Sequence, residues 1–154
     1  MLKVGDSAPD FCLPDQNGRQ VRLSDVLKKS HAIIYFYPKD NTTGCTAQSC
    51  SFRDNFDEVQ DKNTQIIGIS TDDIASHRAF AEQYGLPFIL LSDGNGSVRK
   101  SFGVRKTLGL LPGRATFVVD RHGIIRFAFS SQIHIQRHVD EAIRALAAIE
   151  QDQG

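Results

Sequence analysis

The 154-residue chain lacks the features that mark several specialised classes of protein. Its 18 basic and 18 acidic residues cancel, so bulk charge attracts it neither to nucleic acid nor to an anionic membrane. No apolar run approaches the roughly 20 residues of a membrane-spanning helix. Three cysteines are too few for a disulfide scaffold. These absences favour a globular protein with neither nucleic acid nor membrane as its partner.

The N-terminal sequence also lacks the hydrophobic core of a secretory signal. We therefore expect a cytoplasmic location, where cysteines are more often catalytic or metal-binding than cross-linked. No repeat, linker or low-complexity stretch divides the chain. With 40% hydrophobic and 23% charged residues, the composition is that of an ordinary globular protein, and we predict one domain over residues 1–154.

Apolar runs and amphipathic segments alternate along the chain. Short β-branched and aromatic runs predict strands, and apolar residues at helical spacing predict helices. Their order predicts an α/β fold with a central mixed β-sheet flanked by helices, preceded by an N-terminal β-hairpin. The predicted strands are 31–37, 65–70, 87–91, 115–120 and 124–129, the helices are 45–62, 73–84, a short one ending at 102 and 135–149, and the hairpin pairs 10–13 with 19–23.

Cys45 and Cys50 are the most informative residues. Cys45 lies where the apolar run 31–37 gives way to a predicted helix, and a helix N-terminus offers unpaired N–H groups and the positive end of a dipole. A thiol held there loses its proton more easily, and the thiolate is the nucleophile. Cys50, five residues on, can trap what Cys45 becomes after oxidation. The pair indicates redox catalysis.

Pro38, Thr42 and Cys45 spell Pro-x-x-x-Thr-x-x-Cys, which resembles the peroxidatic motif of the peroxiredoxins. Thr43 departs from the family, which often has proline there. The resemblance extends over nearly the whole chain, and some features resemble the bacterioferritin-comigratory, or Q-type, subfamily. The matching segments are 5–11, 35–40 and 113–117 for the family, and the Cys45–Cys50 spacing, 111–117 and 138–141 for the subfamily.

The resemblance implies a thioredoxin-like fold and a thiol peroxidase. In such an enzyme Cys45 would attack hydrogen peroxide or an organic hydroperoxide, and Cys50 would condense with the resulting sulfenic acid to an intramolecular disulfide. An external dithiol, thioredoxin or glutaredoxin, would then reduce that bond. The resemblance implies no metal, haem or flavin, and it favours a monomer, as many Q-type relatives are.

Three further residues receive roles from the resemblance. The Thr42 hydroxyl would help to place the peroxide and the sulfur, Pro38 would shield the sulfur, and Arg114 would stabilise the thiolate and donate to peroxide oxygens. Each also has a plainer interpretation. Thr42 could simply cap the helix, Pro38 could be an ordinary loop residue, and Arg114 could be a surface arginine in a Pro-Gly turn.

Helix geometry constrains the disulfide. On a regular helix residue 50 is rotated about 140° from residue 45 and lies roughly 7.5 Å further along the axis. The two Cα atoms are then about 8.7 Å apart, beyond the roughly 7 Å that a disulfide allows. The first turns must therefore unwind before Cys50 can attack oxidised Cys45, unless Cys50 serves only in packing.

The remaining candidates have simpler interpretations. Cys12, where the family more often has a small polar residue, lies in an apolar stretch, and we expect it in the core. His134 and His138 have the spacing of metal ligands on one helix, but they lack the intervening Glu of the metalloprotease pattern, and we expect an exposed helix face. Two other functions remain open: a thioredoxin-like disulfide reductase, which would want Cys-x-x-Cys, and a redox sensor or oxidation-triggered chaperone.

Overall fold

The computed structural model describes residues 1–104 and 113–153. At its centre is a five-stranded mixed sheet in the order β5–β4–β3–β6–β7, in which β3, β4 and β5 are parallel and β6 runs antiparallel to both β3 and β7. The strands are β3 (His31–Phe36), β4 (Thr64–Ser70), β5 (Ile89–Ser92), β6 (Ala115–Val119) and β7 (Ile125–Ser130). The predicted mixed sheet is confirmed, and its strand ends differ from the predicted ones by only one or two residues.

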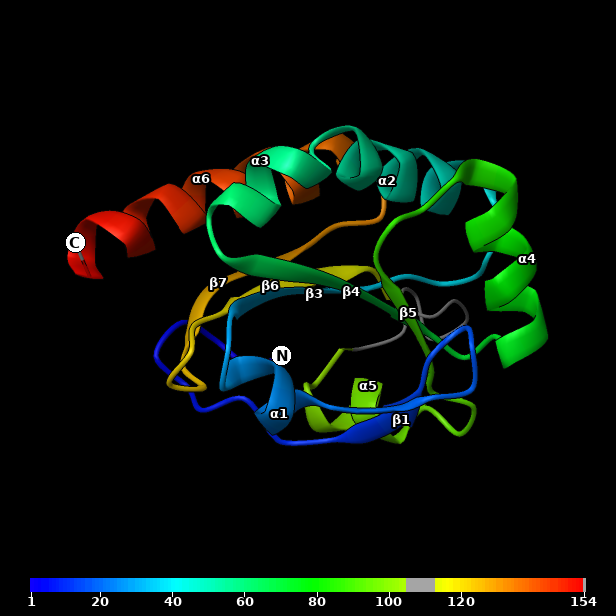
Figure 1. Cartoon of the computed structure of the whole chain (residues 1–154), viewed down its shortest axis with the longest axis horizontal. Coiled ribbons are helices and arrows are strands. Elements are labelled where there is room, and N and C mark those ends of the chain that lie inside the picture. Colours follow the sequence, from blue (N-terminus) through cyan, green and yellow to red (C-terminus); the bar gives the residue numbers. More distant parts are fainter. Residues whose placement is uncertain (105–112, 154) are drawn as a thin grey trace.

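Helices cover both faces of the sheet (Figure 1). The helices α2 (Thr43–Asp54), α3 (Phe56–Asp61) and α6 (Ile135–Gln153) lie along one face. The short helices α1 (Leu23–Leu27) and α5 (Ser97–Ser101) lie on the other face, together with the antiparallel hairpin of β1 (Cys12–Pro14) and β2 (Gln20–Arg22). The helix α4 (Ile74–Tyr84) lies at the β5 side. The predicted N-terminal hairpin is thus confirmed.

Two hydrophobic clusters fill the spaces between the layers, one on each face of the sheet. Every residue of β3 is buried, because both faces of this central strand are covered. Successive side chains alternate between the clusters, as the two-residue period of a strand requires. Ile33, Tyr35 and Tyr37 belong to the cluster that contains Cys45, and Ala32, Ile34 and Phe36 belong to the opposite one.

Gly68 on β4 is required by the close approach of an aromatic ring. A Cβ at this position would lie 2.7 Å from the Tyr35 ring and 2.9 Å from Leu90, distances that no side chain tolerates. The bare backbone lets Tyr35 lie across β4, and its hydroxyl reaches Ser49 Oγ on α2 at 3.0 Å. The sheet therefore holds the helix that carries Cys45 by a hydrogen bond as well as by packing.

The prediction of one continuous helix over 45–62 is wrong, because Asn55 divides it into α2 and α3. Asn55 leaves the helical conformation with φ −106° and ψ 12°, and its side-chain amide donates to the Ser51 carbonyl at 2.8 Å. An asparagine side chain that bonds to nearby backbone competes with the helical hydrogen bonds. Both cysteines consequently lie in a helix that ends before α3 begins.

The expectation that Cys12 lies in the core is also wrong. Cys12 is exposed, and its thiol lies 3.6 Å from Gln20 Oε1 across the hairpin. Side chains alternate along β1, so the buried Phe11 and the half-buried Leu13 lie inward and place Cys12 outward.

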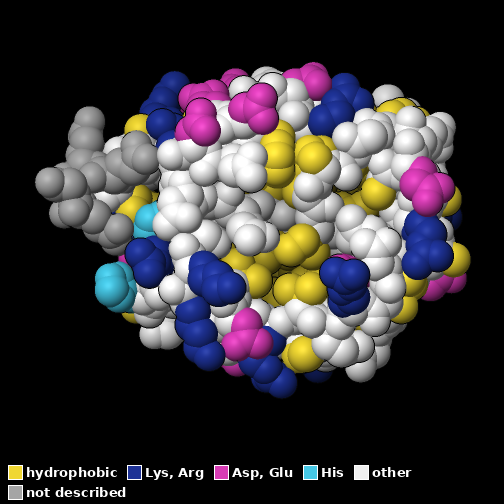
Figure 2. All heavy atoms as spheres, viewed as in Figure 1, with side chains coloured by type: hydrophobic (Ala, Val, Ile, Leu, Met, Phe, Trp, Pro, Cys, Tyr) yellow, Lys and Arg dark blue, Asp and Glu magenta, His cyan; other side chains and the backbone are white. Residues whose placement is uncertain are grey.

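The surface carries both signs of charge. On the face shown in Figure 2, acidic and basic side chains are both present and hydrophobic side chains gather in a central hollow. Among the described residues, no helix is both long enough and apolar enough to span a bilayer.

Candidate active site

Cys45 lies at the start of α2, as predicted. Asn41 adopts a positive φ of 64° and turns the chain between β3 and the helix, and Thr42 occupies the N-cap position. Cys45 is the third residue of α2, in the first turn, where backbone N–H groups have no partner within the helix. Its side chain is fully buried among the hydrophobic residues between α2 and the sheet. The sulfur thus lies at the positive end of a helix and away from bulk water.

Arg114 meets Cys45 although 69 residues separate them in sequence. It precedes β6, its side chain is buried, and its Nη2 donates to Cys45 Sγ at 3.1 Å. The plain interpretation of Arg114 as a surface arginine is wrong. A guanidinium in contact with the sulfur favours the thiolate over the neutral thiol. Residues 111 and 112 of the motif that contains Arg114 lie outside the described residues.

Gly44 makes room for this contact. A Cβ at Gly44 would lie 3.2 Å from Arg114 Nη2 and 3.6 Å from Ile135 Cδ1. A side chain here would push the guanidinium away from the sulfur next door. The glycine before Cys45 is therefore part of the site.

Thr42 and Pro38 lie in the loop that leads into α2. Thr42 holds the N-cap position, but its side chain makes no capping bond, so the capping interpretation applies to its backbone alone. Its hydroxyl donates to the Lys39 carbonyl at 3.0 Å, which leaves the acceptor lone pairs of the oxygen at the helix start. Pro38 is half-buried and follows directly on Tyr37 at the end of β3. Both residues lie on the segment that connects the end of β3, the central strand, to the helix that carries Cys45.

Cys50 shares α2 with Cys45, and both thiols are free. Cys50 is half-buried, whereas Cys45 is fully buried. Because both belong to one regular helix, their Cα atoms stand at the helical separation of about 8.7 Å, which is too long for a disulfide. The free thiols on one intact helix are the arrangement in which we predict that the disulfide cannot form.

A line of buried polar side chains, which we call the polar relay, continues from Arg114 into the protein. It consists of Arg114, Gln48, Thr116 and His138. Arg114 Nη1 donates to Gln48 Oε1, Gln48 Nε2 lies 3.4 Å from Thr116 Oγ1, and that oxygen lies 2.8 Å from His138 Nδ1. His138 Nε2 ends the relay 2.7 Å from the Ser131 carbonyl.

The sequence interpretation missed Gln48 and Thr116, although their spacing carried a signal. Gln48 is three residues after Cys45, which places it on the same side of a helix. Thr116 is two residues after Arg114, which places it on the same face of a strand. Either spacing could have pointed to a partner for the arginine.

The expectation of an exposed face for His138 is wrong, whereas His134 is exposed. His138 is fully buried, and its ring lies 4.7 Å from the ring of Phe129 on β7. The pKa of His138 is lowered to about 4, chiefly by burial, with the charges of Arg114 and Arg137 acting in the same direction and the hydrogen bond to the Ser131 carbonyl acting in the opposite one. The ring is therefore neutral at neutral pH.

Arg99 on α5 is a second buried guanidinium that the sequence interpretation missed. Its Nη2 donates to the Tyr37 carbonyl at 2.9 Å and its Nη1 donates to the Gly113 carbonyl. Burial lowers the pKa of Arg99. One side chain thus joins the residue before Pro38 to the residue before Arg114, and no sequence pattern predicted these contacts.

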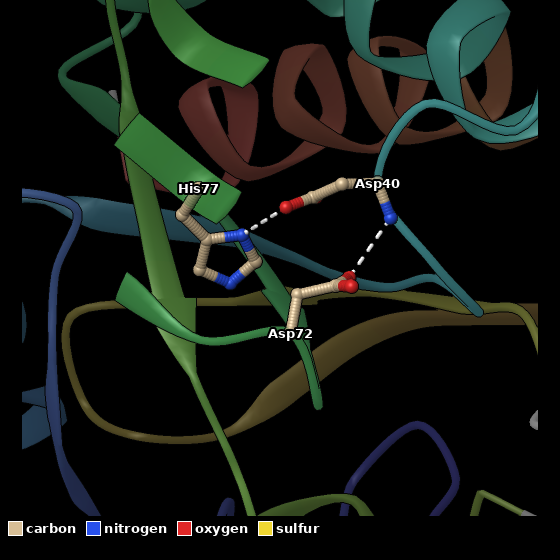
Figure 3. A group of neighbouring side chains, drawn as sticks. All are labelled: Asp40, Asp72 and His77. Atoms are coloured by element: carbon tan, nitrogen blue, oxygen red, sulfur yellow. Dashed lines mark hydrogen bonds and ion pairs between the residues drawn. The ribbon is translucent and has the colours of Figure 1, made fainter. Parts of the chain in front are cut away.

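A second polar cluster, which we call the loop anchor, holds the segment before α2. It consists of Tyr37, Asp40, Asp72, Ser76 and His77. Figure 3 shows its centre, where His77 Nδ1 lies 2.7 Å from Asp40 Oδ2 and the Asp40 backbone N–H donates to Asp72 Oδ2 at 2.8 Å. Tyr37 donates to Asp40 Oδ1 at 2.6 Å, and Ser76 donates to Asp40 Oδ2 at 2.9 Å.

Asp40, Asp72 and His77 have the residue types of a metal site, and their ligating atoms lie within 4.8 Å of one another. His77 Nδ1 and Asp40 Oδ2 lie 2.7 Å apart, at hydrogen-bond distance, so the lone pair or proton of Nδ1 is directed at the carboxylate. His77 Nε2 is already 2.9 Å from the Leu91 carbonyl. In this arrangement the cluster is a hydrogen-bonded anchor, and we assign no ion to it.

Comparison with known proteins connects this site to a described family. The model of the AhpC/TSA family matches residues 4–128. The chloroplastic peroxiredoxin Q of Arabidopsis thaliana is 46% identical over 148 residues, which are 96% of this chain and 68% of that protein. The chloroplastic peroxiredoxin Q of Oryza sativa subsp. japonica is 44% identical over 149 residues, with 96% and 68% covered.

Two solved structures extend the comparison to the fold. Peroxidoxin BcpB from Mycobacterium tuberculosis matches with a TM-score of 0.90 and 39% identity, covering 97% of this chain and 99% of that chain. Peroxiredoxin Q of Xanthomonas campestris matches with a TM-score of 0.83 and 30% identity, covering 90% of each chain. The expected thioredoxin-like arrangement, a mixed sheet flanked by helices, is confirmed.

Proposed function

Because this chain belongs to the AhpC/TSA family and is a peroxiredoxin of the Q type, we propose that Cys45 is its peroxidatic cysteine and Cys50 its resolving cysteine. The protein is a thiol peroxidase that uses peroxide substrates and thioredoxin-type reductants. A thioredoxin-like disulfide reductase, the alternative that the sequence left open, is set aside on this ground. The assignment of roles to individual residues rests on the geometry of the site.

In the first step the Cys45 thiolate attacks one oxygen of the peroxide. The S–O bond forms as the O–O bond breaks, so the sulfur is oxidised to a sulfenic acid and the peroxide is reduced to an alkoxide or hydroxide, which takes up a proton and leaves as alcohol or water. Arg114 Nη2 stabilises the thiolate before the attack. Thr42 offers acceptor lone pairs to a peroxide O–H at the helix start.

One observation supports the assignment: Arg114 contacts Cys45 and has a further buried N–H group that is available to a substrate. Its Nε has no hydrogen-bond partner among the described residues, although it is shielded from solvent. A buried N–H without an acceptor is costly, so a site that retains one has a use for it. We assign this donor to the peroxide oxygen on which negative charge develops, an electrostatic stabilisation of the transition state.

In the second step the Cys50 thiol condenses with the sulfenic acid, and an S–S bond forms while water leaves. This step requires the first turns of α2 to unwind, because the helix holds the two cysteines apart. A dithiol reductant then exchanges with the disulfide, restores both thiols and becomes oxidised itself. Between the two reductants that the sequence left open, we propose thioredoxin rather than glutaredoxin.

A coupled assay tests these roles. Peroxide consumption is followed with thioredoxin, thioredoxin reductase and NADPH for the wild type and for Cys45→Ser, Cys50→Ser and Cys12→Ser. We expect no turnover for Cys45→Ser, a single reaction with peroxide followed by overoxidation for Cys50→Ser, and nearly normal turnover for Cys12→Ser, whose thiol is exposed on the hairpin. Normal turnover of Cys50→Ser would remove Cys50 from the mechanism.

The same assay separates an enzyme from a sensor. A peroxidase consumes many equivalents of peroxide, whereas a redox sensor stops after one oxidation of its thiols. We further propose that residues 1–154 form one domain that acts as a monomer in the cytoplasm. Sedimentation equilibrium of the reduced protein tests the monomer, and a dimer mass would contradict it.

A further inference from the structure

Arg114 reaches two partners, and only one of them is the reacting sulfur. Nη2 donates to Cys45 Sγ, and Nη1 donates to Gln48 Oε1. Nε has no hydrogen-bond partner among the described residues. The hydrogen bond from Nη1 to the Gln48 carbonyl oxygen therefore fixes the plane of the guanidinium. That plane in turn decides how Nη2 is directed at the Cys45 sulfur.

The orientation of the Gln48 amide is decided further along the relay. Oε1 faces Arg114 only when Nε2 faces an acceptor, and the atom 3.4 Å from Nε2 is Thr116 Oγ1. A hydroxyl that must accept there has to give its own proton elsewhere. The acceptor that takes it is His138 Nδ1, at 2.8 Å.

His138 in turn has its tautomer fixed by a backbone carbonyl. The Ser131 carbonyl can only accept, so His138 Nε2, 2.7 Å away, carries the ring proton and Nδ1 is the acceptor. Gln48, Thr116 and His138 are all fully buried, so water does not compete with these bonds. The donor and the acceptor of every hydrogen bond between the Ser131 carbonyl and Arg114 are thereby determined.

We propose that Thr116 and His138 are positioning residues for the peroxide reaction, because through Gln48 they hold Arg114 in its contact with Cys45. This inference rests on the proposed role of Cys45. Neither residue touches the reacting atoms. Their effect is to make the guanidinium a fixed donor rather than a rotating one.

The relay also connects the two steps of the reaction. Gln48 lies on α2, which must unwind for the disulfide, whereas Thr116 lies on β6 and His138 on α6. Unwinding α2 therefore breaks the relay at Gln48. A weakened relay slows the peroxide step, which uses the folded helix, but leaves unchanged or accelerates disulfide formation, which uses the unwound one.

Two matched pairs of variants test the proposal. Thr116→Val keeps the shape of the side chain and removes the hydroxyl, and Thr116→Ser keeps the hydroxyl. His138→Leu removes both ring nitrogens, and His138→Gln restores a donor and an acceptor in one side chain. The rate constants of Cys45 oxidation by hydrogen peroxide and of disulfide formation are measured by stopped flow, and the pH midpoint of Cys45 alkylation is measured in a Cys50→Ser background.

We expect Thr116→Val and His138→Leu to lower the peroxide rate constant about tenfold and to raise the alkylation midpoint, while disulfide formation is not slowed. Thr116→Ser and His138→Gln should stay within about twofold of the wild type, since the hydrogen bonds survive. Equal rate constants in Val and Ser variants would overturn the proposal, as would a parallel loss of both steps. The two positions lie on different elements, β6 and α6, so if a variant at one position fails to fold, the variants at the other still provide the test.

The proposed role of Cys45 fails separately from this inference. If Cys45→Ser still consumes peroxide, the peroxidatic assignment is wrong whatever the Thr116 and His138 variants do. If Cys45→Ser is inactive and Thr116→Val matches the wild type, the peroxidatic assignment stands and only the positioning role is wrong.

Discussion

The polar relay and the loop anchor are two polar clusters near the start of α2, and they differ in the segment that they hold. The relay is hydrogen-bonded to α2 itself, through Gln48, and contacts the sulfur through Arg114. The anchor holds the loop before the helix, through hydrogen bonds of the side chain and backbone of Asp40. Unwinding the first turns of α2 breaks the first cluster and need not disturb the second.

This difference shows how a short helix can open without loosening the sheet. The anchor joins Asp40 to α4 and to the end of β4, elements that contain neither cysteine. The relay joins the reactive helix to β6 and α6 by side chains alone. The chain is thus held firmly at Asp40 and then continues into α2, whose hydrogen bonds to β6 and α6 can break when the helix unwinds. The following changes test this contrast, from the largest expected effect to the smallest.

Removing the carboxylate of the anchor should cost the most stability. Asp40→Asn leaves Tyr37, Ser76 and His77 without the carboxylate that they share, and leaving buried hydrogen-bonding groups unsatisfied costs about 3 kcal/mol of unfolding free energy. Urea unfolding measures the loss. Lys39→Gln, one residue away and exposed, is the control and should change stability by less than about 0.5 kcal/mol. Equal unfolding free energies of the two variants would show that the loop anchor does not stabilise the folded protein.

Removing the arginine of the relay should affect catalysis most. Arg114→Leu deprives Cys45 Sγ of its donor and the peroxide of a second one, so we expect the rate constant of peroxide reduction to fall roughly hundredfold. Stopped-flow oxidation of the reduced protein measures it. Arg114→Lys keeps the charge without the planar fork and should recover only part of the rate. A rate within twofold of the wild type for Arg114→Leu would exclude Arg114 from the mechanism.

Oxidation should separate the two clusters in amide hydrogen exchange. In the disulfide form we expect residues 45–52 to lose roughly tenfold or more of their protection, because α2 cannot stay helical with its cysteines bonded. The Asp40 amide, which donates to Asp72, should keep its protection. Mass spectrometry confirms that the Cys45–Cys50 bond is present. Equal protection of residues 45–52 in both redox states would contradict the unwinding.

Acid should weaken the relay side of the protein through His138. The unfolded ring takes up a proton below its ordinary pKa of 6.5, but burial keeps the folded ring neutral down to a pKa of about 4. The unfolded state then binds more protons between these values, so stability falls with falling pH by about 1 kcal/mol per pH unit in that window. Arg114 and Arg137 are the charged groups that act on the ring.

Urea unfolding at several pH values, with His138→Gln as the matched variant, measures this slope. The variant has no proton to bind at residue 138, and its stability should depend less on pH between about 4 and 6.5. Identical pH profiles of wild type and His138→Gln would show that the ring is not held neutral in the folded protein.

Most of the fold and the centre of the site could be predicted from local patterns. The apolar runs became the five strands, and the cysteine at the strand-to-helix junction lies in the first turn of α2. The errors occur where the placement of a single residue differs from what the pattern of its neighbours predicts. Asn55 ended the helix with its own side chain, and Cys12 faced outward because the strand alternates and its neighbours were the more apolar residues. His138 was misplaced because a polar residue on a helix is ordinarily exposed, and only partners from other elements make burial tolerable.

The sequence by itself determined the elements, the two cysteines and the conflict between their helix and their disulfide, because periodicity and helix geometry act over a few residues. The tertiary structure decided which polar groups meet. Arg114 reaches Cys45, Gln48 reaches Thr116, and Arg99 joins Tyr37 to Gly113 only after the sheet has brought β3 and β6 together as neighbours. Such contacts depend on strand order and on how helices cover the sheet, and these are properties of the whole core rather than of any segment.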